Sequence, residues 1–600
     1  MTAILSKNWV ISWGWRLKPR AALCVWLLAT VSTAVADQAA ARDSVIVISG
    51  GPLAPAIAAL SRQTGIAIGI EGELPTVSVN PVRGTMSPAS ALKRMLRGTG
   101  LVAVRVGKSS YRLERQDRLS PVLQPAAVVA SVPQDIVVTA GKRNEMLVDI
   151  PLSVSVVSLP EGAAMEGTAG TAAIAGRIEG LALTNIGPGH NRQFIRGVAD
   201  SPFSGPSQST VSLQIDDVRA TYNAPDPDLR LVDIERVEVL KGPQGPLYGT
   251  GALGGVYHII TRKPDLERFS AFVSADGAVI NDGDYGVGGQ AMFNIPVVAN
   301  RLGFRAVAYA SREPGWIDTA AGGDRNYMKL SGGRAALRAI PADGWTLDVA
   351  GTIQWLHVDD SQYVFARHSR FRDTTVSEPQ DNDFRMSSAT LRGSVGGVQI
   401  LAAVGLVGHE VKTGLDATAS AAALGVSGPA FVEEERKYHM FDSELRLSGG
   451  GVSSLQWLGG VSYLNADNRQ DSDLAANGAN ASLPLLKWRQ QVSESAIFGE
   501  VSIPILTRFR AVAGARLFHW SIENETGLNL GSVSNSRSKT GVTPSLALQW
   551  KPGSHSMIFA RYASAFRPGG LSPTTASDGS YDSDELANFE LGTRLSFLGG

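Results

Sequence analysis

The stretch Asp233–Pro264, DIERVEVLKGPQGPLYGTGALGGVYHIITRKP, carries the clearest structural signal in the chain. It predicts two short strands, Arg236–Leu240 and Val256–Thr261, because both runs are rich in β-branched and apolar residues. The connection between them contains six glycines and two prolines. A joint of this composition fixes a particular backbone path instead of burying side chains.

One motif inside the stretch imitates a nucleotide-binding site. Gly249–Gly254, GTGALG, matches the dinucleotide fingerprint letter for letter. That fingerprint must follow a strand directly and open a helix. Here Pro243 and Pro246 precede it and a β-branched run follows. The glycines therefore indicate a structural turn, and nucleotide binding is the weaker interpretation.

The same residues resemble the end of the plug domain of TonB-dependent outer-membrane receptors. The matching pattern is RVEVLKGPQG, then Leu-Tyr-Gly, Gly-Gly and Ile-Ile-Thr. The sequence departs from it at Pro246, at Thr250 and at the pair Tyr257-His258. The residues that the resemblance marks as the structural motif of the plug are Gly197, Lys241, Gly242, Pro243, Gly245, Gly249, Gly254 and Gly255.

Composition limits the classes of protein to consider. The chain has 600 residues, with 55 basic and 55 acidic side chains, so it shows no electrostatic footprint of a nucleic-acid-binding protein. Residues 1–36 hold four basic residues, an apolar run and Ala34-Val35-Ala36, which predicts a secretory signal peptide. The only cysteine, Cys24, lies in it, so the exported chain would have no disulfide. The sequence contains no run of about 18 apolar residues, so it predicts no transmembrane helix.

Residues 43–115 predict a small α/β domain. Strand-like runs at Val45–Ile48, Ile66–Ile70 and Leu101–Val106 alternate with two helices, the second beginning at Ser87-Pro88. The run 91–101, ALKRMLRGTGL, is similar to the short N-terminal domain shared by secretins and signalling-type TonB-dependent receptors. That resemblance implies contact with a periplasmic anti-sigma regulator. A periplasmic domain with another role is the alternative.

Residues 116–134 are rich in Ala, Val, Pro and Ser and predict an extended linker. A β-prone hexapeptide follows, and such a segment can add a strand to the sheet edge of a partner. It resembles the TonB box, and the resemblance implies TonB, with its inner-membrane energising complex, as the partner. The same pattern would also fit a buried edge strand. The predicted box consists of Asp135, Ile136, Val137, Val138, Thr139 and Ala140.

Residues 141–265 would form the plug, an α/β domain with strands at Ile150–Val157, Phe194–Gly197 and Val211–Ile215 and a weak helix within 162–178. Asp217 stands where the family usually has glycine, which removes some freedom to adopt positive φ. These departures leave the expected fold unchanged. They put the ligand in doubt.

Residues 266–600 predict a transmembrane antiparallel β-barrel, so the fold class is mainly β. In Trp345–Trp355, apolar and polar residues alternate over about ten positions, as they do in a barrel strand with one face in lipid. About fourteen strands can be counted, joined alternately by short and long connections. Receptors of the resembled family have 22 strands, so we expect the sequence to stop before the barrel is complete. A soluble β-sandwich is the alternative.

Charged plug residues must find partners inside the barrel, because a buried charge is costly alone. The resemblance implies a latch in which Arg196 and Arg236 pair with carboxylates of the barrel wall, for which Glu500 and Glu590 are candidates, and Glu238 belongs to the same motif. Arginines could also steer an anionic ligand such as a ferric chelate, although a solvated loop explains them too. The candidates are Arg192, Arg367, Arg370 and Arg372.

No catalytic triad, zinc spacing or P-loop is present, so the sequence predicts no enzyme, no cofactor and no metal site. The prediction is a receptor in the outer membrane of a Gram-negative bacterium, embedded in its lipid, which takes up a ferric siderophore and signals to the anti-sigma regulator. A carbohydrate, cobalamin or another metal chelate is the alternative cargo. Transcriptional signalling as the main output is a further alternative.

Overall fold

The computed structural model describes residues 44–70, 77–97, 99, 101–107, 110–115, 137–139, 141–159, 170–184, 186–200, 208–280, 283–319, 326–364, 369–451, 454–476, 482–528, 531–553, 556–571 and 580–595. The chain divides into two compact units, Met1–Ala130 and Ser131–Gly600. The predicted signal peptide and the whole of the predicted linker lie outside the described residues.

The first unit is a small α/β domain with its own core. Helix α2 (Leu53–Thr64) ends at Gly65, whose φ of 68° gives a left-handed cap, and α3 (Pro88–Met95) is capped by Ser87, whose side chain accepts a bond from Ser90 N. Both predicted helices are therefore confirmed. The strands are β1 (Ser44–Ile48), β2 (Gly51–Pro52), β3 (Ala67–Ile70), β4 (Ser78–Val79), β5 (Val82–Met86), β6 (Leu101–Gly107) and β7 (Ser110–Arg115), paired as β1-β5, β2-β4 and β3-β7-β6.

The second unit contains the plug, built on a five-stranded mixed sheet of order β10-β15-β16-β13-β14. Its strands are β10 (Val154–Ser158), β13 (Val211–Ile215), β14 (Val218–Arg219), β15 (Ile234–Lys241) and β16 (Gly255–Thr261). Smaller elements around it are β8 (Val137–Val138), β9 (Glu145–Met146), η1 (Leu147–Asp149), α4 (Thr171–Ala175), β11 (Leu181–Leu183), β12 (Gln193–Ile195) and α5 (Gly245–Tyr248). The two strands predicted in the opening stretch correspond to β15 and β16, which pair antiparallel.

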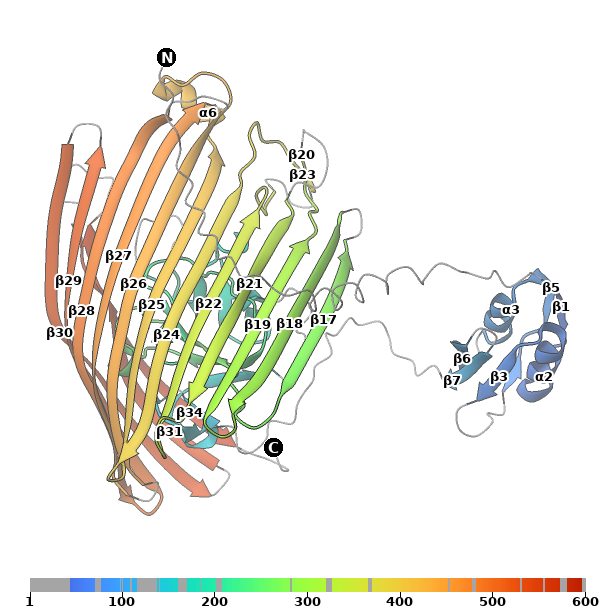
Figure 1. Cartoon of the computed structure of the whole chain (residues 1–600), viewed down its shortest axis with the longest axis horizontal. Helices are drawn as coiled ribbons and strands as arrows, with labels where there is room; N and C mark the ends of the chain where they lie inside the picture. Colours follow the sequence, from blue (N-terminus) through green and yellow to red (C-terminus); the bar gives the residue numbers. More distant parts are fainter. Residues whose placement is uncertain are drawn as a thin grey trace, which may run out of the picture. The chain divides into compact units, whose positions relative to one another are not determined.

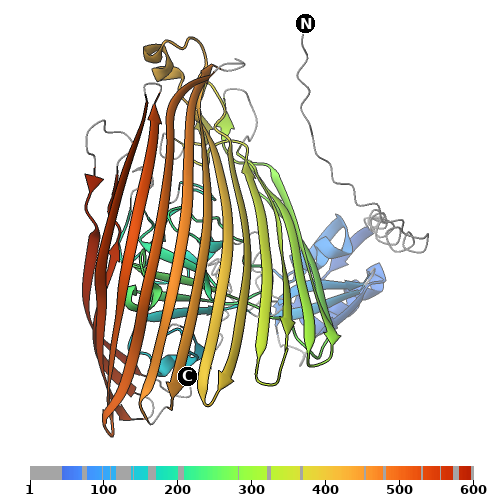
Figure 2. The ribbon, with the colours of Figure 1, turned by 60° about the vertical axis from the view of Figure 1, so that its left-hand side comes forward.

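A 14-stranded antiparallel sheet encloses the plug, and each strand pairs with the next long strand along the chain (Figures 1 and 2). Its strands are β17 (Ser270–Val279), β18 (Tyr285–Val298), β19 (Leu302–Glu313), β21 (Met328–Ala339), β22 (Thr346–Val358), β24 (Gln380–Val395), β25 (Val398–Asp416), β26 (Ala430–Gly450), β27 (Gln456–Ala476), β28 (Ser482–Leu506), β29 (Phe509–Leu528), β30 (Gly531–Gly553), β31 (Ser556–Arg567) and β34 (Asp584–Leu595). The predicted count of about fourteen strands is confirmed.

Short connecting elements complete the second unit. Strands β20 (Asp318–Thr319) and β23 (Phe371–Arg372) pair in parallel, and β32 (Gly570–Leu571) pairs with β33 (Ser580–Tyr581). Helices α6 (Thr418–Ala421) and η2 (Ala422–Leu424) lie between β25 and β26. They mark the end of the sheet opposite the short turns, such as Gly396-Gly397 between β24 and β25 (Figure 1).

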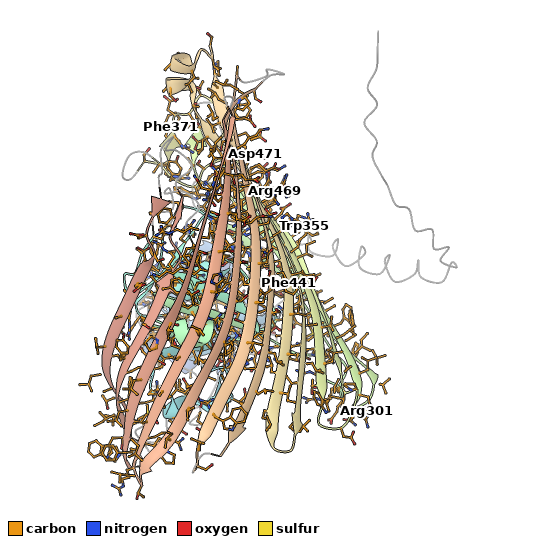
Figure 3. All side chains as sticks on the ribbon, turned by 90° about the vertical axis from the view of Figure 1, so that its left-hand side faces the viewer. Arg301, Trp355, Phe371, Phe441, Arg469 and Asp471 are labelled. Atoms are coloured by element: carbon orange, nitrogen blue, oxygen red, sulfur yellow. The ribbon has the colours of Figure 1, made fainter. Side chains whose placement is uncertain are left out.

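Alternation along β22 sorts side chains by polarity, as predicted. Val349 and Trp355 are exposed on the outer face, whereas Asp348 and Gln354 are buried on the inner face. On β27 the outward residues are apolar from Trp457 to Tyr463 and then polar. About nine to eleven residues of a tilted strand cross the hydrocarbon core. The longer strands therefore continue past the apolar band, where Figure 3 places Arg469 and Asp471 above Trp355 and Phe441.

Candidate functional site

The glycine-rich connection lets the plug approach the barrel wall closely. A Cβ on Gly245 would lie 2.5 Å from the carbonyl oxygen of Ser564 in β31. A Cβ on Gly255, where φ is 148°, would lie 2.0 Å from the carbonyl oxygen of Leu240. Any side chain at these two positions would clash with backbone. The glycines of the opening stretch thus shape the path between β15 and β16, as the sequence predicts.

The predicted TonB box lies against β15 at the residues that the structure describes. Val137 and Val138 form β8 and pair with Met146 and Glu145 of β9; we call β8, β9 and the turn residues 141–144 the box hairpin. Val138 is fully buried, whereas Val137 is 45% exposed. Asp135, Ile136 and Ala140 lie outside the described residues.

Thr139 fastens the box hairpin to Glu238 of β15. Its backbone N–H donates to both carboxylate oxygens of Glu238, at 3.1 and 3.0 Å, and its hydroxyl donates to Oε2 at 3.1 Å. Tyr248 in α5 donates its hydroxyl to the carbonyl oxygen of Thr139 at 3.4 Å. Glu238 is completely buried, so the N–H and hydroxyl of Thr139 and the Arg236 guanidinium replace its lost hydration.

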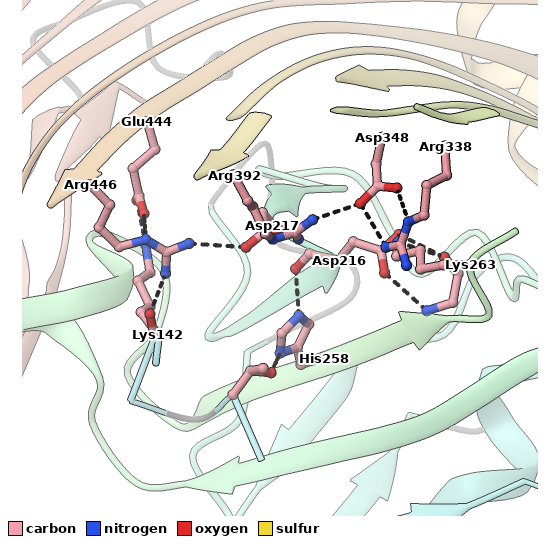
Figure 4. Close-up of polar contacts among 12 residues, drawn as sticks. Lys142, Asp216, Asp217, His258, Lys263, Arg338, Asp348, Arg392, Glu444 and Arg446 are labelled. Atoms are coloured by element: carbon pink, nitrogen blue, oxygen red, sulfur yellow. Dashed lines mark hydrogen bonds and ion pairs between the residues drawn. The ribbon is translucent and has the colours of Figure 1, made fainter. Parts of the chain in front are cut away.

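A cluster of charged groups joins the plug to the inner wall of the sheet (Figure 4). Asp217 forms ion pairs with Arg392 of β24 and, at 3.0 Å, with Arg446 of β26. Arg392 also reaches Asp348 of β22 at 2.7 Å, which Arg338 holds from the other side. The cluster therefore binds one plug turn to four wall strands, β21, β22, β24 and β26.

The turn that contains Asp217 is also attached to β16 and to the residues that follow it. Lys263 Nζ lies 2.6 Å from Asp216 Oδ2, and His258 Nε2 lies 2.5 Å from the backbone oxygen of Asp216. The opposing cations hold the pKa of Asp216 and of Asp217 below the usual value even though burial alone would raise it. Both carboxylates therefore remain ionised anchors.

The box hairpin has two anchors of its own on the wall. Lys142 forms an ion pair with Glu444 of β26, and Arg143 Nη2 lies 2.5 Å from Glu500 Oε1 of β28. Burial lowers the pKa of Lys142 to about 8, against the opposing effect of Glu444. Neither Lys142 nor Arg143 was predicted as an anchor, because an ion pair between residues so far apart in sequence leaves no local pattern.

The predicted latch residues divide into two groups. Arg196 Nη2 lies 3.0 Å from Glu590 Oε1, a contact between plug and wall, and its role as a latch stays a prediction. Arg236 instead bonds Glu235 and, at 2.8 Å, Glu238 on its own strand. Glu500 is held by Arg143 and not by Arg236. Residues two apart on a strand lie on the same face, so Arg236 can pair with Glu238 without reaching the wall.

The arginines predicted to contact ligand also have partners within the protein. Arg372 is 1% exposed, forms an ion pair with Glu378 and stacks over the ring of Tyr363. Arg192 lies 3.5 Å from Asp200, and Arg370 bonds the backbone oxygen of Trp316. Arg367 lies outside the described residues. These contacts order the plug and a loop, and a role in ligand binding stays a prediction.

The other plug motif residues frame the same region. Gly197, with φ of 75°, follows Arg196, and Pro243 offers its carbonyl oxygen to Arg561 of β31. Gly242 and Gly249 also have positive φ, and Gly254 accepts a backbone bond from Gly242. Lys241 and its neighbours thus position the start of α5 rather than a bound phosphate.

Among the described residues, no helix has the length and apolar character needed to span a membrane. In the same part of the chain, no group of three or more His, Cys, Asp or Glu side chains is placed to hold a metal ion.

Fold and sequence together define the class of protein. Residues 147–256 match the TonB-dependent receptor plug domain, and residues 282–600 match the β-barrel described as TonB dependent receptor-like. The second match covers more than half of the 600 residues. The chain therefore belongs to the TonB-dependent receptors, a family of outer-membrane β-barrels that bind ligands such as siderophores and interact with TonB.

Individual relatives are distant. The pesticin receptor of Yersinia pestis is 24% identical over 511 residues, covering 79% of this chain and 71% of the relative. The metal-pseudopaline receptor of Pseudomonas aeruginosa is 24% identical over 428 residues, and the match spans 64% of this chain and 56% of that receptor. These relatives are receptors and not enzymes.

Solved structures agree on the fold. The ferric yersiniabactin uptake receptor of Yersinia pestis superposes with a TM-score of 0.62 at 18% identity, over 74% of this chain and 70% of that one. The ferripyoverdine receptor of Pseudomonas aeruginosa superposes with a TM-score of 0.60 at 17% identity, over 93% of this chain and 75% of that one.

Proposed function

We propose that this receptor imports a ferric siderophore across the outer membrane, driven by TonB. The observation that carries the proposal is the box hairpin, in which the predicted box residues Val137, Val138 and Thr139 are fastened to the plug motif through Glu238. A pull on this segment acts directly on β15. Export of the chain by a signal peptide at residues 1–36 belongs to the same proposal.

TonB would engage the box by replacing an intramolecular strand pair. Among the described residues, β8 contributes two, Val137 and Val138, to its pairing with β9, so few hydrogen bonds there oppose its release. A partner strand that pairs with the full hexapeptide would gain more main-chain bonds than the hairpin loses. Thr139 would then leave Glu238, and the anchors at Lys142 and Arg143 would break next.

The predicted latch takes a narrower form in this proposal. Arg196–Glu590 joins plug to wall directly, whereas Arg236–Glu238 holds the site to which the box is bonded. Removal of Thr139 strips three hydrogen bonds from a completely buried carboxylate. The buried Glu238 carboxylate would then have too few hydrogen bonds to replace its hydration, which would loosen β15 in the plug. The box and the latch thus act as one unit.

A siderophore is the favoured cargo because of the names of the relatives and the solved structures. The relatives include a metal-pseudopaline receptor and a pesticin receptor. The solved structures include a ferric yersiniabactin uptake receptor, a ferripyoverdine receptor and a siderophore receptor of Acinetobacter baumannii. Vitamin B12 transporters match a shorter part, 29% identical over 183 residues in Vibrio vulnificus. Cobalamin, a carbohydrate or another metal chelate is therefore the alternative cargo.

A second candidate output is signalling to a periplasmic anti-sigma regulator through the first unit. This α/β unit has its own core, including Leu60, Leu92 and Met95. The superposition on the ferripyoverdine receptor spans 93% of the chain and so reaches into this unit, which supports a common fold. Transcriptional signalling would then accompany transport or replace it as the main output.

Uptake assays test the proposal. Cells that lack the gene, cells that carry it and cells that carry a deletion of residues 135–140 receive labelled ferric chelates, cobalamin and sugars. We expect one class of ferric chelate to accumulate only with the intact gene. Accumulation of a sugar or cobalamin instead would reject the siderophore. Uptake that survives the deletion of 135–140 would reject the box.

A deletion of residues 44–115 separates transport from signalling. If transport is the main function, this variant keeps uptake and loses only the induction of gene expression by ligand. Retained induction would exclude the first unit as the signalling element.

A further inference from the structure

Two cavities open at the short-turn end of the sheet, one on each side of the box hairpin. The first, of about 750 Å³, lies between the hairpin, α5 and the ends of β28–β31. The second, of about 820 Å³, lies between the hairpin, β16 and the ends of β22–β26. Short turns face the periplasm in barrels of this kind. Both cavities therefore lie on the exit side of the plug, away from outer loops.

The hairpin is the partition between the cavities. Arg143, Asn144 and Glu145 border both of them, as does Gln456 of β27. The partition is attached to the wall by Lys142–Glu444 and Arg143–Glu500 (Figure 4 shows the first pair). A pull that releases the hairpin would thus join the cavities without requiring the five-stranded sheet to unfold.

Cations outnumber acidic groups in the wall of each cavity. The first is lined by Arg143, Arg508, Arg510, Lys551 and Arg561, against Glu145, Asp149 and Glu500. The second is lined by seven lysines and arginines, against five aspartates and glutamates. Clefts lined mainly by one sign of charge concentrate ions of the opposite sign.

The first cavity also contains guanidinium groups with bonding capacity to spare. Arg561 uses Nη2 to bond the carbonyl oxygen of Pro243 and Gln244 Oε1, at 3.3 and 3.2 Å. Its Nη1, like Nη1 of Arg143, is buried and has no hydrogen-bond partner among the described residues. A guanidinium with an open N–H position matches carboxylate geometry. Both residues line the same cavity.

We propose that the first cavity is an exit vestibule that binds an anionic, carboxylate-bearing ligand, with Arg561 and Arg143 as its anchors. The box hairpin closes the vestibule at rest and opens it toward the second cavity when TonB removes it. This inference rests on the proposed function and refines it, because it restricts the cargo to chelates with negative charge. Arg143 moves with the hairpin, so its release would also weaken the hold on the cargo.

Charged thiol reagents measure the predicted electrostatic field in the purified full chain. Ser545 lines the first cavity, and its neighbour two residues along β30, Ala547, pairs with Arg561. Cys24, in the predicted signal peptide, is the only cysteine in the sequence, so Ser545→Cys would place a single thiol in the mature chain. We compare its rate of reaction with an anionic sulfonate and with a cationic trimethylammonium methanethiosulfonate, each normalised to a free thiol.

We expect the anionic reagent to react faster by about threefold or more, as a net positive potential requires. Arg561→Gln in the Ser545→Cys background should bring the ratio close to one, and Arg561→Lys should restore most of it. Arg301→Gln is the matched control, because Arg301 lies at the same end of the sheet on an exposed turn, outside both cavities. A ratio near one in the parent, or one that Arg561→Gln leaves unchanged, would overturn the proposal.

Citrate supplies the ligand test. Citrate should slow modification of Ser545→Cys in a saturable manner, and Arg561→Gln should weaken this protection by about tenfold. Protection that is equal in both proteins would reject Arg561 as an anchor. These assays need neither TonB nor uptake, so the vestibule and the proposed transport function can fail independently.

Discussion

In both the wall and the plug, side chains alternate between the two faces of each strand, but what those faces contact differs. On the wall, apolar residues such as Leu546 and Ile497 are exposed on the outer face, while Gln354 and Asp348 are buried inside. In the plug, Val237 and Val239 are buried, and so is Glu238 between them. The wall has lipid on one face, but the plug has protein on both. Polarity alone therefore identifies the wall strands, whereas plug charges need specific partners.

The largest expected effect tests a buried plug charge. Glu238→Ala removes a completely buried carboxylate and leaves Arg236 and Thr139 without their shared partner. Loss of one member of a buried ion pair costs about 3–5 kcal/mol. We expect the plug to unfold at lower urea concentration in detergent micelles.

Glu235→Ala is the matched control for this change. Glu235 also bonds Arg236 from β15, but its side chain is 45% exposed. Its removal should change the unfolding free energy by about 1 kcal/mol or less. Equal losses for the two glutamates would show that burial does not decide the energy of plug charges.

The next effect tests the lipid face of the wall. Leu546 lies on β30 between Val542 and Trp550, all of them exposed on the outer face. Leu546→Arg places a charge in the apolar band and should cost about 2–4 kcal/mol of folding free energy. Folding into lipid vesicles, followed by gel mobility before and after heating, measures this loss. Leu546→Met should fold like the parent, and a fully stable Leu546→Arg would place this face outside lipid.

A smaller effect depends on pH. Burial, and then the neighbouring Asp228, raise the pKa of Asp226 in the plug to about 6. The folded protein binds this proton more tightly than the unfolded chain, so the contribution to stability is complete below about pH 4. It is lost as pH rises through about 6, with a slope of at most about 1.4 kcal/mol per pH unit.

Urea unfolding at pH 4, 5, 6 and 7 measures this slope. Asp226→Asn should flatten it between pH 4 and 6. The exposed Asp343, changed to asparagine, should leave it as in the parent. An unchanged slope in Asp226→Asn would assign the pH dependence to another group.

The smallest effect concerns the latch pair that joins plug and wall directly. The Arg196 side chain is 36% exposed where it meets Glu590, so solvent screens the pair. Arg196→Ala should cost about 1 kcal/mol or less, and added salt should reduce even that. A loss as large as that of Glu238→Ala would give this pair a much larger role in holding the plug.

The sequence predicted most of the fold because local patterns determine it. Strands β15 and β16 begin and end within two residues of their predicted limits, and the wall has the predicted number of strands. The alternation predicted strands of about ten residues joined by long connections, but strands such as β27 extend well into those connections. Beyond the apolar band both faces of β27 are polar, as at Arg469 on the outer face and Gln470 on the inner face, so alternation no longer marks a strand.

Charge partners were harder to predict than strands. Arg236 and Glu238 are two residues apart and share a face, a signal that the sequence contains. The pairs Arg143–Glu500 and Asp217–Arg446 depend on the register between plug and wall, which the sequence does not encode locally. Asp217 was noticed only as an unusual replacement for glycine, whereas it is a principal anchor of the plug.

In the proposed mechanism, strand β8 must separate from β9 before cargo can pass the plug. Val137→Cys with Met146→Cys would join two directly paired and partly exposed residues by a disulfide. We predict that the oxidised double variant binds its labelled ferric chelate on whole cells but does not import it, and that a reductant restores import. Each single variant should import normally. Import by the oxidised double variant at the parental rate would contradict the claim.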